Sequence, residues 1–480
     1  MATITASGPL STVQWTGNNN IDALMKRSWD GTTIWANHSV TYSFPDVNSS
    51  WDSQYYNANW NSPTVAGGFR PLNSAQQQTV RDILAIWSDV ANINFIEVSE
   101  TSSSVGDIRI GYSNIGGMAG FSNGPMESSI AGDLWLNSNQ YNSSYAPGQL
   151  MNFVIMHELG HALGFKHPMP DSDMASRGLD RSLPTEVDNH QYTIMSYTSG
   201  SGYNGVYPST PMLFDIQAIQ HMYGANNNTR TGNDVYTVLS TSPTVMTIWD
   251  AGGTDTISAS DSTRSVTIDL REGHFSSIRA YMTDNIGIAY GVVIENAIAG
   301  SGNDTLISNS YSNILNGGAG VDTVQYDGAR SNYTITQNST GHTVTDNVGT
   351  IDTLTDIERL QFSNNEILPL SSLGVDVTFN EPNATMKNYF LLTLLTQTTD
   401  IVAHFSTQDL ISTATAGQDY ISTSQTATIL AGTKTYAFGV DILSDNYAES
   451  QESIVAKVVL EIVGQPNIEL TATHTILANG

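Results

Sequence analysis

Three of the ten histidines in this 480-residue chain fall within one short segment, HELGHALGFKH, which begins at His157. On a helix, residues four apart share a face, so His157 and His161 aim their rings at one point. Gly164 lets the chain leave the helix and bring back His167 as a third ligand. Three neutral imidazoles suit Zn²⁺ and leave its fourth position to a water, from which Glu158 can take a proton as general base. The alternative is a set of core histidines bonded to carbonyls, which would bury three polar rings for no return.

Two helices are predicted around this segment. The stretch GQLMNFVIMHELGHALGF is apolar on nearly every face, which predicts a buried helix from about 148 to 163. An earlier amphipathic helix is predicted with Ser74 as its N-cap, and its apolar residues recur at helical spacing at Val80, Ile83, Leu84 and Trp87. Strands are predicted at 39–45, 93–98, 106–113 and 132–137. We therefore expect an α+β domain with a mixed sheet, preceded up to about Asn37 by a loop or pro-segment.

A second motif, TIMSY, follows at residues 193–197. Met195 could form an apolar floor under the metal, and Tyr197 could bring its hydroxyl close to it. Taken alone, the pentapeptide favours Met195 as an ordinary core residue. Together with the three histidines, it favours the metal floor.

These motifs resemble the metzincin zinc endopeptidases, and among them the bacterial serralysins. The pattern H-E-x-x-H-x-x-G-x-x-H is complete, and Pro168 directly follows the third histidine, as in serralysins. The similarity extends from about Trp15 to Val324 and includes GDLWLN, FDIQAIQHMYG and WDAGGTDTI. It implies that Glu158 is the general base of peptide hydrolysis. It also implies that Tyr197 ligates zinc at rest and stabilises the oxyanion during turnover.

Composition limits the other functions. The chain carries 17 Lys and Arg against 45 Asp and Glu, a net charge of −28, which disfavours nucleic acid and anionic membranes as partners and leaves carboxylates for Ca²⁺. It has no cysteine, which excludes disulfides, thiolate metal sites and a cysteine nucleophile. No stretch of eighteen apolar residues predicts membrane insertion, and the first residues show no Sec signal pattern.

A nine-residue register runs through residues 299–325, in the rows AGSGNDTLI, SNSYSNILN and GGAGVDTVQ. The third row matches G-G-x-G-x-D-x-U-x, the repeat of calcium-binding parallel β-rolls, and DAGGTDTIS at 250–258 fits the same frame. Leu306, Leu315 and Val324 are expected to form one internal column. An irregular Gly-Asn-Asp loop is the alternative. The incomplete second row indicates a short, degraded version of the roll that serralysins carry.

The predicted calcium ligands share this register or lie at the junction before it. Aligned side chains and glycine carbonyls would supply the oxygens of a hard-cation site. The resemblance adds Asp234, in the segment TRTGNDVY. The full set is Asp234, Asp255, Asp304, Asn313, Asp322, Gly300, Gly302, Gly317, Gly318 and Gly320.

The last hundred residues read as strands separated by turns, which predicts a β-sandwich. TATAGQDYIS and a late acidic stretch resemble a Calx-β domain. That resemblance implies calcium ligands at Glu381, Asp419, Asp445 and Glu452, with Glu449 either joining them or remaining plain surface. A sandwich that serves as a spacer or adhesive module without metal is the alternative.

We therefore expect four parts: an N-terminal extension or pro-segment at 1–38, a zinc protease domain at 39–224, a β-roll at 225–373 and the sandwich at 374–480. The expected function is a secreted, extracellular zinc endopeptidase that acts on protein substrates and is stabilised by Ca²⁺. The resemblance implies a bacterial type I secretion system as export partner, although the final THTILANG lacks the expected acidic-hydrophobic ending. The alternatives are a protease held latent by residues 1–38, and an inactive metzincin-domain protein acting as a calcium-dependent adhesin or matrix protein.

Overall fold

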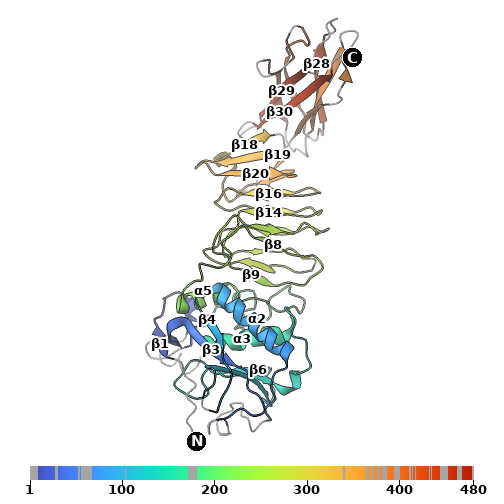
Figure 1. Cartoon of the computed structure of the whole chain (residues 1–480). Coiled ribbons are helices and arrows are strands. Elements are labelled where there is room, and N and C mark those ends of the chain that lie inside the picture. Colours follow the sequence, from blue (N-terminus) through green and yellow to red (C-terminus); the bar gives the residue numbers. More distant parts are fainter. Residues whose placement is uncertain are drawn as a thin grey trace. The chain divides into compact units, whose positions relative to one another are not determined.

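The structure is a computed structural model in which two compact units are distinguished (Figure 1). The first unit contains residues 1–255 and 271–293, and the second contains residues 256–270 and 294–480. The residues that the structure describes are 9–26, 31–51, 55, 68–102, 104–170, 181–279, 281–338, 341–363, 367–369, 372–375, 379–380, 386–393, 400–409, 412, 414–416, 418–431, 433, 435–443, 452–461 and 468–477. No helix among them is long and apolar enough to span a membrane.

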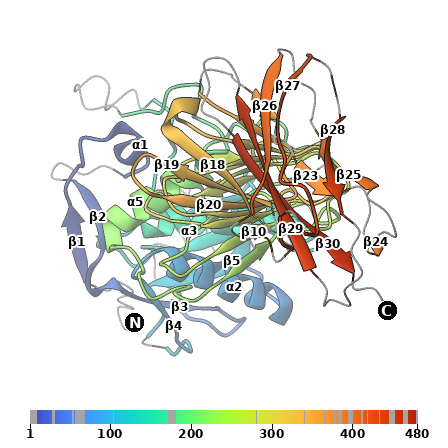
Figure 2. The ribbon, with the colours of Figure 1, turned by 90° about the horizontal axis from the view of Figure 1, so that it is seen from above.

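The N-terminal segment is part of the folded unit, so the expectation of a loop is wrong for its described residues. Strands β1 (Leu10–Val13) and β2 (Thr32–Trp35) pair antiparallel, as Figure 2 shows, and the short helix α1 (Asn19–Asp22) lies between them in the chain. The Trp35 indole donates a hydrogen bond to the carbonyl of Ala162. The segment lacks a sequence period because its elements are four residues long. Its role as a pro-segment remains a proposal.

The sheet of the first unit has the order β4-β3-β5-β7-β6. The four predicted strands are confirmed as β3 (Ser39–Ser43), β4 (Asn94–Glu97), β5 (Ile108–Ser113) and β7 (Leu134–Asn137). They run parallel, whereas β6 (Gly120–Ser122) runs antiparallel to β7 at the edge of the sheet. Sequence reasoning missed β6 because three residues, Gly-Phe-Ser, are too few to show alternation.

Three helices accompany this sheet: α2 (Ser74–Val90), α3 (Leu150–Leu163) and α5 (Leu213–Tyr223). The buried face of α2 carries the predicted apolar residues, which confirms the helical spacing. Its N-cap is Asn73 rather than Ser74. The side chains of Asn73 and Gln76 each accept the other's backbone N–H, at 3.0 and 2.9 Å, and this reciprocal pair determines where the helix begins.

The first unit also includes strands from the region predicted as the roll. These are β8 (Val235–Thr237), β9 (Met246–Ile248), β12 (Phe275–Ser276) and β13 (Ile286–Ile288). Strand β13 pairs parallel with β9 and antiparallel with β12. The ring of Phe275 lies edge-on to Tyr192, 5.5 Å between centroids, in the loop before the TIMSY motif. These strands therefore support the region of the histidines.

The second unit begins with a parallel β-roll, as predicted, built mostly from three-residue strands in two ladders. One ladder contains β10 (Thr256–Ser258), β14 (Asn296–Ile298), β16 (Ile314–Asn316) and β20 (Ile351–Thr355). The other contains β11 (Thr267–Asp269), β15 (Thr305–Ile307), β17 (Thr323–Gln325) and β21 (Arg359–Gln361), and β22 (Ile367–Pro369) pairs antiparallel with β21 at its end. Strands β18 (Tyr333–Asn338) and β19 (Gly341–Asp346) extend the first ladder beyond β20.

The predicted single column of apolar residues is wrong. Leu306 stacks on Val324, eighteen residues away, whereas Leu315 lies in the other ladder. All three side chains are fully buried. Because two nine-residue rows complete one turn of a roll, successive rows alternate between its two sheets, and only every second row stacks.

The predicted β-sandwich is confirmed for the described C-terminal residues. One sheet contains β23 (Ser372–Val375), β25 (Met386–Thr393) and β28 (Thr435–Ile442). The other contains β24 (Phe379–Asn380), β26 (Ile401–Thr407), β27 (Ser424–Ile429), β29 (Glu452–Glu461) and β30 (Ile468–Leu477) (Figure 2). Phe405 and Phe438 stack 4.8 Å apart between the sheets. This aromatic core lies between the two sheets, and the described residues of the sandwich include no helix.

Candidate metal centre and active site

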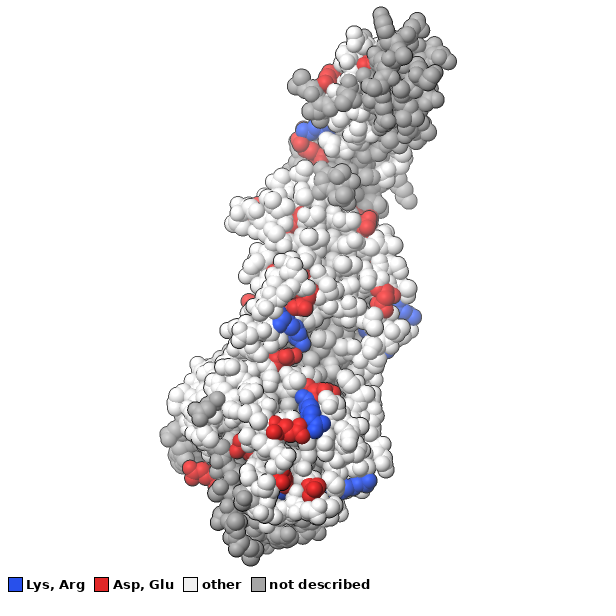
Figure 3. Space-filling view, viewed as in Figure 1, with Lys and Arg blue, Asp and Glu red and all other residues white. Residues whose placement is uncertain are grey.

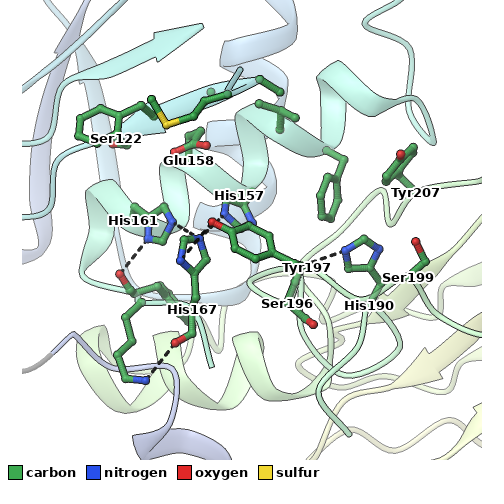
Figure 4. Close-up of a pocket in the computed structure, with 18 of the residues that line it drawn as sticks. Ser122, His157, Glu158, His161, His167, His190, Ser196, Tyr197, Ser199 and Tyr207 are labelled. Atoms are coloured by element: carbon green, nitrogen blue, oxygen red, sulfur yellow. Dashed lines mark hydrogen bonds between the residues drawn. The ribbon is translucent and has the colours of Figure 1, made fainter. Parts of the chain in front are cut away.

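Three imidazoles converge at one point beside helix α3 (Figure 4). The Nε2 atom of His167 lies 3.1 Å from Nε2 of His157 and 3.0 Å from Nε2 of His161. Nitrogens at 2.0–2.1 Å from a tetrahedral Zn²⁺ would be about 3.3 Å apart, so the observed spacing suits such an ion with little adjustment. Helix α3 ends at Gly164, whose φ of 112° lies in the left-handed region, and this reversal returns His167 as predicted.

The orientation of the histidine rings favours a cation at the point where their Nε2 atoms meet. The Nδ1 atom of His157 lies 2.7 Å from the Ile194 carbonyl, and Nδ1 of His161 lies 3.0 Å from the Phe165 carbonyl. A carbonyl only accepts hydrogen bonds, so each Nδ1 carries the proton and each Nε2 presents a lone pair. Two such lone pairs facing a third imidazole would repel one another unless a cation lies among them.

The protonation states in this site also suit a metal. Burial lowers the pKa of His157 and of His167 to about 4, and lowers that of His161, so all three rings are neutral near pH 7. Burial raises the pKa of Glu158 to about 8. A carboxyl group with that pKa would be a poor base at neutral pH, and an adjacent divalent cation would favour its ionised form.

The TIMSY segment lies directly beneath the histidines. Met195 is fully buried, and its sulfur lies 2.8 Å from the position that a Cβ on Gly160 would occupy, so it packs against the helix between the first two histidines. Buried Asp215, on α5, accepts hydrogen bonds from the Thr193 hydroxyl at 2.6 Å and the Ile194 N–H at 2.8 Å. Because the Ile194 carbonyl orients His157, Asp215 is a positioning residue that the sequence did not reveal.

Tyr197 lies at the rim of the site. Its side chain is 67% exposed, and its hydroxyl is 3.4 Å from Nδ1 of His167. The two rings are 4.4 Å apart between centroids. The hydroxyl thus lies beside the third histidine, and the exposed ring has room to move.

The histidines open into a cleft of about 770 Å³. Edge strand β6 forms one wall, and Gly120 lies so close to Glu158 that a Cβ there would be 2.8 Å from the carboxylate Oε1. Aromatic rings line another part of the cleft: Phe153 lies 4.6 Å from His190 and 5.1 Å from Tyr207 between centroids. Figure 4 shows His190 and Tyr207 on the opposite side of the site from His161. The cleft therefore offers different surroundings on its two sides.

A separate carboxylate cluster lies in the first unit. Oxygens of Asp234, Asp250 and Asp255 all lie within 4.8 Å of one another, and the latter two residues are buried. Asp234 and Asp255 were predicted, and the structure brings them together. Asp250 was missed, although it opens the row DAGGTDTIS, because the repeat assigns a ligand only to its sixth position. Three acids around one point are a suitable oxygen set for Ca²⁺.

The predicted column of roll ligands is divided between the two ladders. Asp322 Oδ1 accepts the backbone N–H of Asp304 at 2.7 Å, while its Oδ2 is buried without a hydrogen-bond partner among the described residues. Asn313 lies on the other side, where its N–H donates to Asp352 at 2.9 Å. The single column of Asp304, Asn313 and Asp322 is therefore wrong, for the same reason as the apolar column. At each of the five predicted glycines, a Cβ would come within 2.4 Å of a neighbouring turn.

The sandwich residues give less information. Asp419 is 9% exposed, and its carboxylate accepts the N–H of Thr415, closing its own loop. Glu381, Asp445 and Glu449 lie outside the described residues. Glu452 begins β29, but its side chain also lies outside the description. Calcium binding by this domain remains a proposal of the sequence resemblance.

Two family models match the chain. The model for matrixin matches residues 70–177, and the model for the Peptidase M10 serralysin C terminal matches residues 214–470, more than half of the chain.

Individual serralysins are also similar to this chain in sequence. Serralysin of Proteus mirabilis is 33% identical over 322 residues, covering 60% of this chain and 63% of that protein. Serralysin C of Dickeya chrysanthemi is 38% identical over 307 residues, covering 58% and 61%. The chain thus spans less than two thirds of the length of these two relatives. Among solved structures, the apo-form Calx CBD1 domain is 19% identical with a TM-score of 0.19, covering 23% of this chain and 98% of that chain.

The link from Asp215 to His157 predicts the effect of one substitution. Asp215→Ala should free the Thr193–Ile194 segment and loosen the carbonyl that orients the first ligand. Loss of such an outer partner typically weakens metal affinity by about 10- to 100-fold. Competition with a chelator would measure it, with exposed Asp82→Ala as control. Equal affinity in the two variants would contradict the link.

Proposed function

Because the chain belongs to the serralysin family of M10 peptidases, we propose that it is a secreted zinc endopeptidase that hydrolyses internal peptide bonds of proteins. The observation that carries this proposal is the convergence of three imidazole Nε2 atoms beside a buried carboxylate. His157, His161 and His167 would hold the zinc. When bound, Zn²⁺ supplies Lewis acidity, which polarises a substrate carbonyl and makes a water more acidic.

The chain's own residues supply the remaining steps. Glu158 would take the proton of the attacking water on its carboxylate and pass it to the departing amine. The substrate backbone would add along the free edge of β6, where Gly120 leaves room beside Glu158. The exposed Tyr197 hydroxyl would swing from His167 and donate a hydrogen bond to the oxyanion.

Retention of Glu158 favours an enzyme over the alternative of an inactive adhesin, since loss of that one carboxylate would abolish catalysis. The latent form is favoured less by the fold. Among the described residues of the segment 1–38, Lys26 is the one that lines the cleft. A single side chain at one end of the cleft would not block the binding of a substrate. Secretion is supported by the acidic composition and by the family, whose calcium-binding repeats suit extracellular calcium concentrations.

The first test is Glu158→Gln, which keeps the size of the side chain and removes the base. Hydrolysis of casein should fall by about two orders of magnitude or more, while zinc content and melting temperature stay unchanged. In contrast, His161→Ala should lower the zinc content itself. Activity near that of the wild type in Glu158→Gln would exclude this residue as the base.

Tyr197→Phe tests the oxyanion donor, because it deletes the hydroxyl and keeps the ring. We expect kcat to fall more than KM rises, since the hydroxyl would act in the transition state. Steady-state kinetics on a single peptide would separate the two constants. An effect confined to KM would instead give Tyr197 a role in substrate binding.

We also propose that Ca²⁺ binds at Asp234, Asp250 and Asp255, and in the roll beside Asp304 and Asp322. Burial and nearby acids raise the pKa of Asp322 to about 6, and a bound cation would favour its ionised form. Glycine carbonyls of the turns at 300–302 and 317–320 would complete the roll site.

Calcium removal should therefore open residues 299–325 before helix α3, since an ion bound only by the folded roll adds stability that its removal withdraws. Hydrogen exchange with and without a calcium-selective chelator would measure this difference. Equal protection of 299–325 in both conditions would make these rows an ordinary β segment without calcium.

A further inference from the structure

A lysine lies at one end of the cleft. Lys26 is exposed and lines the cleft, although it comes from the N-terminal segment. Its backbone N–H donates to the Gly164 carbonyl at 2.8 Å, and the Lys166 N–H donates to the Leu24 carbonyl at 2.7 Å. These two hydrogen bonds hold the backbone at Lys26 antiparallel to the segment that follows α3. The position of the lysine is therefore set by the same turn that returns His167.

The side chain of Lys26 crosses the edge of the sheet beyond β6. A Cβ on Gly124 would lie 2.9 Å from the lysine Nζ and 3.2 Å from its Cδ, so glycine leaves the space that the lysine stem occupies. The same point is 3.4 Å from the carbonyl of His161. Residues 123 and 124 continue the edge of β6, because Asn123 N–H donates to the Asp133 carbonyl at 3.0 Å. The ammonium group thus lies beside the path that a peptide on β6 would follow.

The ammonium group of Lys26 has no hydrogen bond or ion pair with any residue that the structure describes, in a chain of net charge −28. Its neighbour differs, since the Lys166 Nζ donates to the carbonyls of His167 and Arg181, both at 3.0 Å. Lys and Arg form only small, isolated patches on the face shown in Figure 3. An unpaired cation in a cleft of so acidic a protein is complementary to a carboxylate on a ligand.

We propose that Lys26 is a specificity-determining residue that selects substrates with an acidic side chain on the His161 side of the cleaved bond. This inference rests on the proposed peptidase function. Gly120, beside Glu158, and Gly124, beside Lys26, are four positions apart. At roughly 3.3 Å per extended residue this is about 13 Å. The acidic residue therefore lies about three or four positions from the residue held at Glu158.

The test uses matched fluorogenic peptides with Glu or Gln at each of the four positions on either side of one cleavable bond. For wild-type protein we expect Glu to raise kcat/KM about fivefold at one or two adjacent positions on one side only, less so at high salt. Lys26→Gln should abolish this preference, Lys26→Glu should reverse it, and Lys26→Arg should retain it. Lys387→Gln, in strand β25, removes the same charge outside the cleft and should leave the preference unchanged.

A second variant tests the position of the lysine rather than its charge. Gly124→Ala places a methyl group where the lysine stem runs, and it should weaken the preference for Glu with the net charge unchanged. Peptide binding by zinc-loaded Glu158→Gln, measured by fluorescence anisotropy, should show the same dependence on Lys26 without turnover. Binding can be compared even if a Lys26 variant is less stable than the wild type. Lys26→Arg, which keeps the charge, should bind the peptides as the wild type does.

The outcomes separate the two claims. If wild-type protein cleaves no peptide in the set, the proposed function fails. If it cleaves the Gln and Glu peptides equally well, or if Lys26→Gln keeps the preference for Glu, the peptidase stands and the role of Lys26 is overturned. If Lys26→Gln has a lower melting temperature but keeps the preference for Glu peptides, the lysine only anchors the N-terminal segment.

Discussion

The first unit is organised around three imidazole lone pairs that must face one another. An N–H on His167 could satisfy only one of the two facing lone pairs, on His157 and His161, at 3.0–3.1 Å, whereas a cation would satisfy all three nitrogens, so the chain has to impose this arrangement. Helix α3 supplies two rings four residues apart, and Gly164 supplies the reversal that returns the third. Carbonyls of Ile194 and Phe165 fix the tautomers of the first two rings. Helix α3, Gly164 and Phe165 are consecutive in the chain, whereas Ile194 comes from a later loop that is held by Asp215 of α5, so the site depends on packing between distant segments.

Burial has opposite effects on the two kinds of group in the site. It keeps the histidines neutral, so they can bind a metal without first losing a proton, and it also disfavours the ionised form of Glu158. A divalent cation bound by the three neutral rings would favour the ionised form of Glu158. In the proposed mechanism, the metal, the base and the apolar helix would therefore depend on one another. In the roll, buried acids such as Asp322 lie beside the apolar column, and the calcium proposed there would offset the cost of burying them.

The parts of this account that sequence could predict are those governed by local spacing. The interval from His157 to His161, the glycine at 164 and the nine-residue rows each follow from backbone geometry, and the structure contains all three. The stacking of the rows was wrong because spacing along the chain does not say which of two sheets a row joins. Asp215 and Lys26 could not be predicted, because each lies beside residues distant in sequence, and Asp250 was missed because it stands at a position to which the repeat assigns no ligand. The short strand β6 lacked a pattern, yet it forms the wall of the cleft.

The central claim is that the three histidines hold one zinc ion. X-ray absorption at the zinc edge, on purified protein with its metal stoichiometry determined, tests it most directly. The account predicts one tightly held zinc per chain, with three imidazole nitrogens at about 2.0–2.1 Å and a lighter oxygen ligand in the remaining position. Zinc bound by fewer than three imidazoles, or bound only by oxygen, would contradict it.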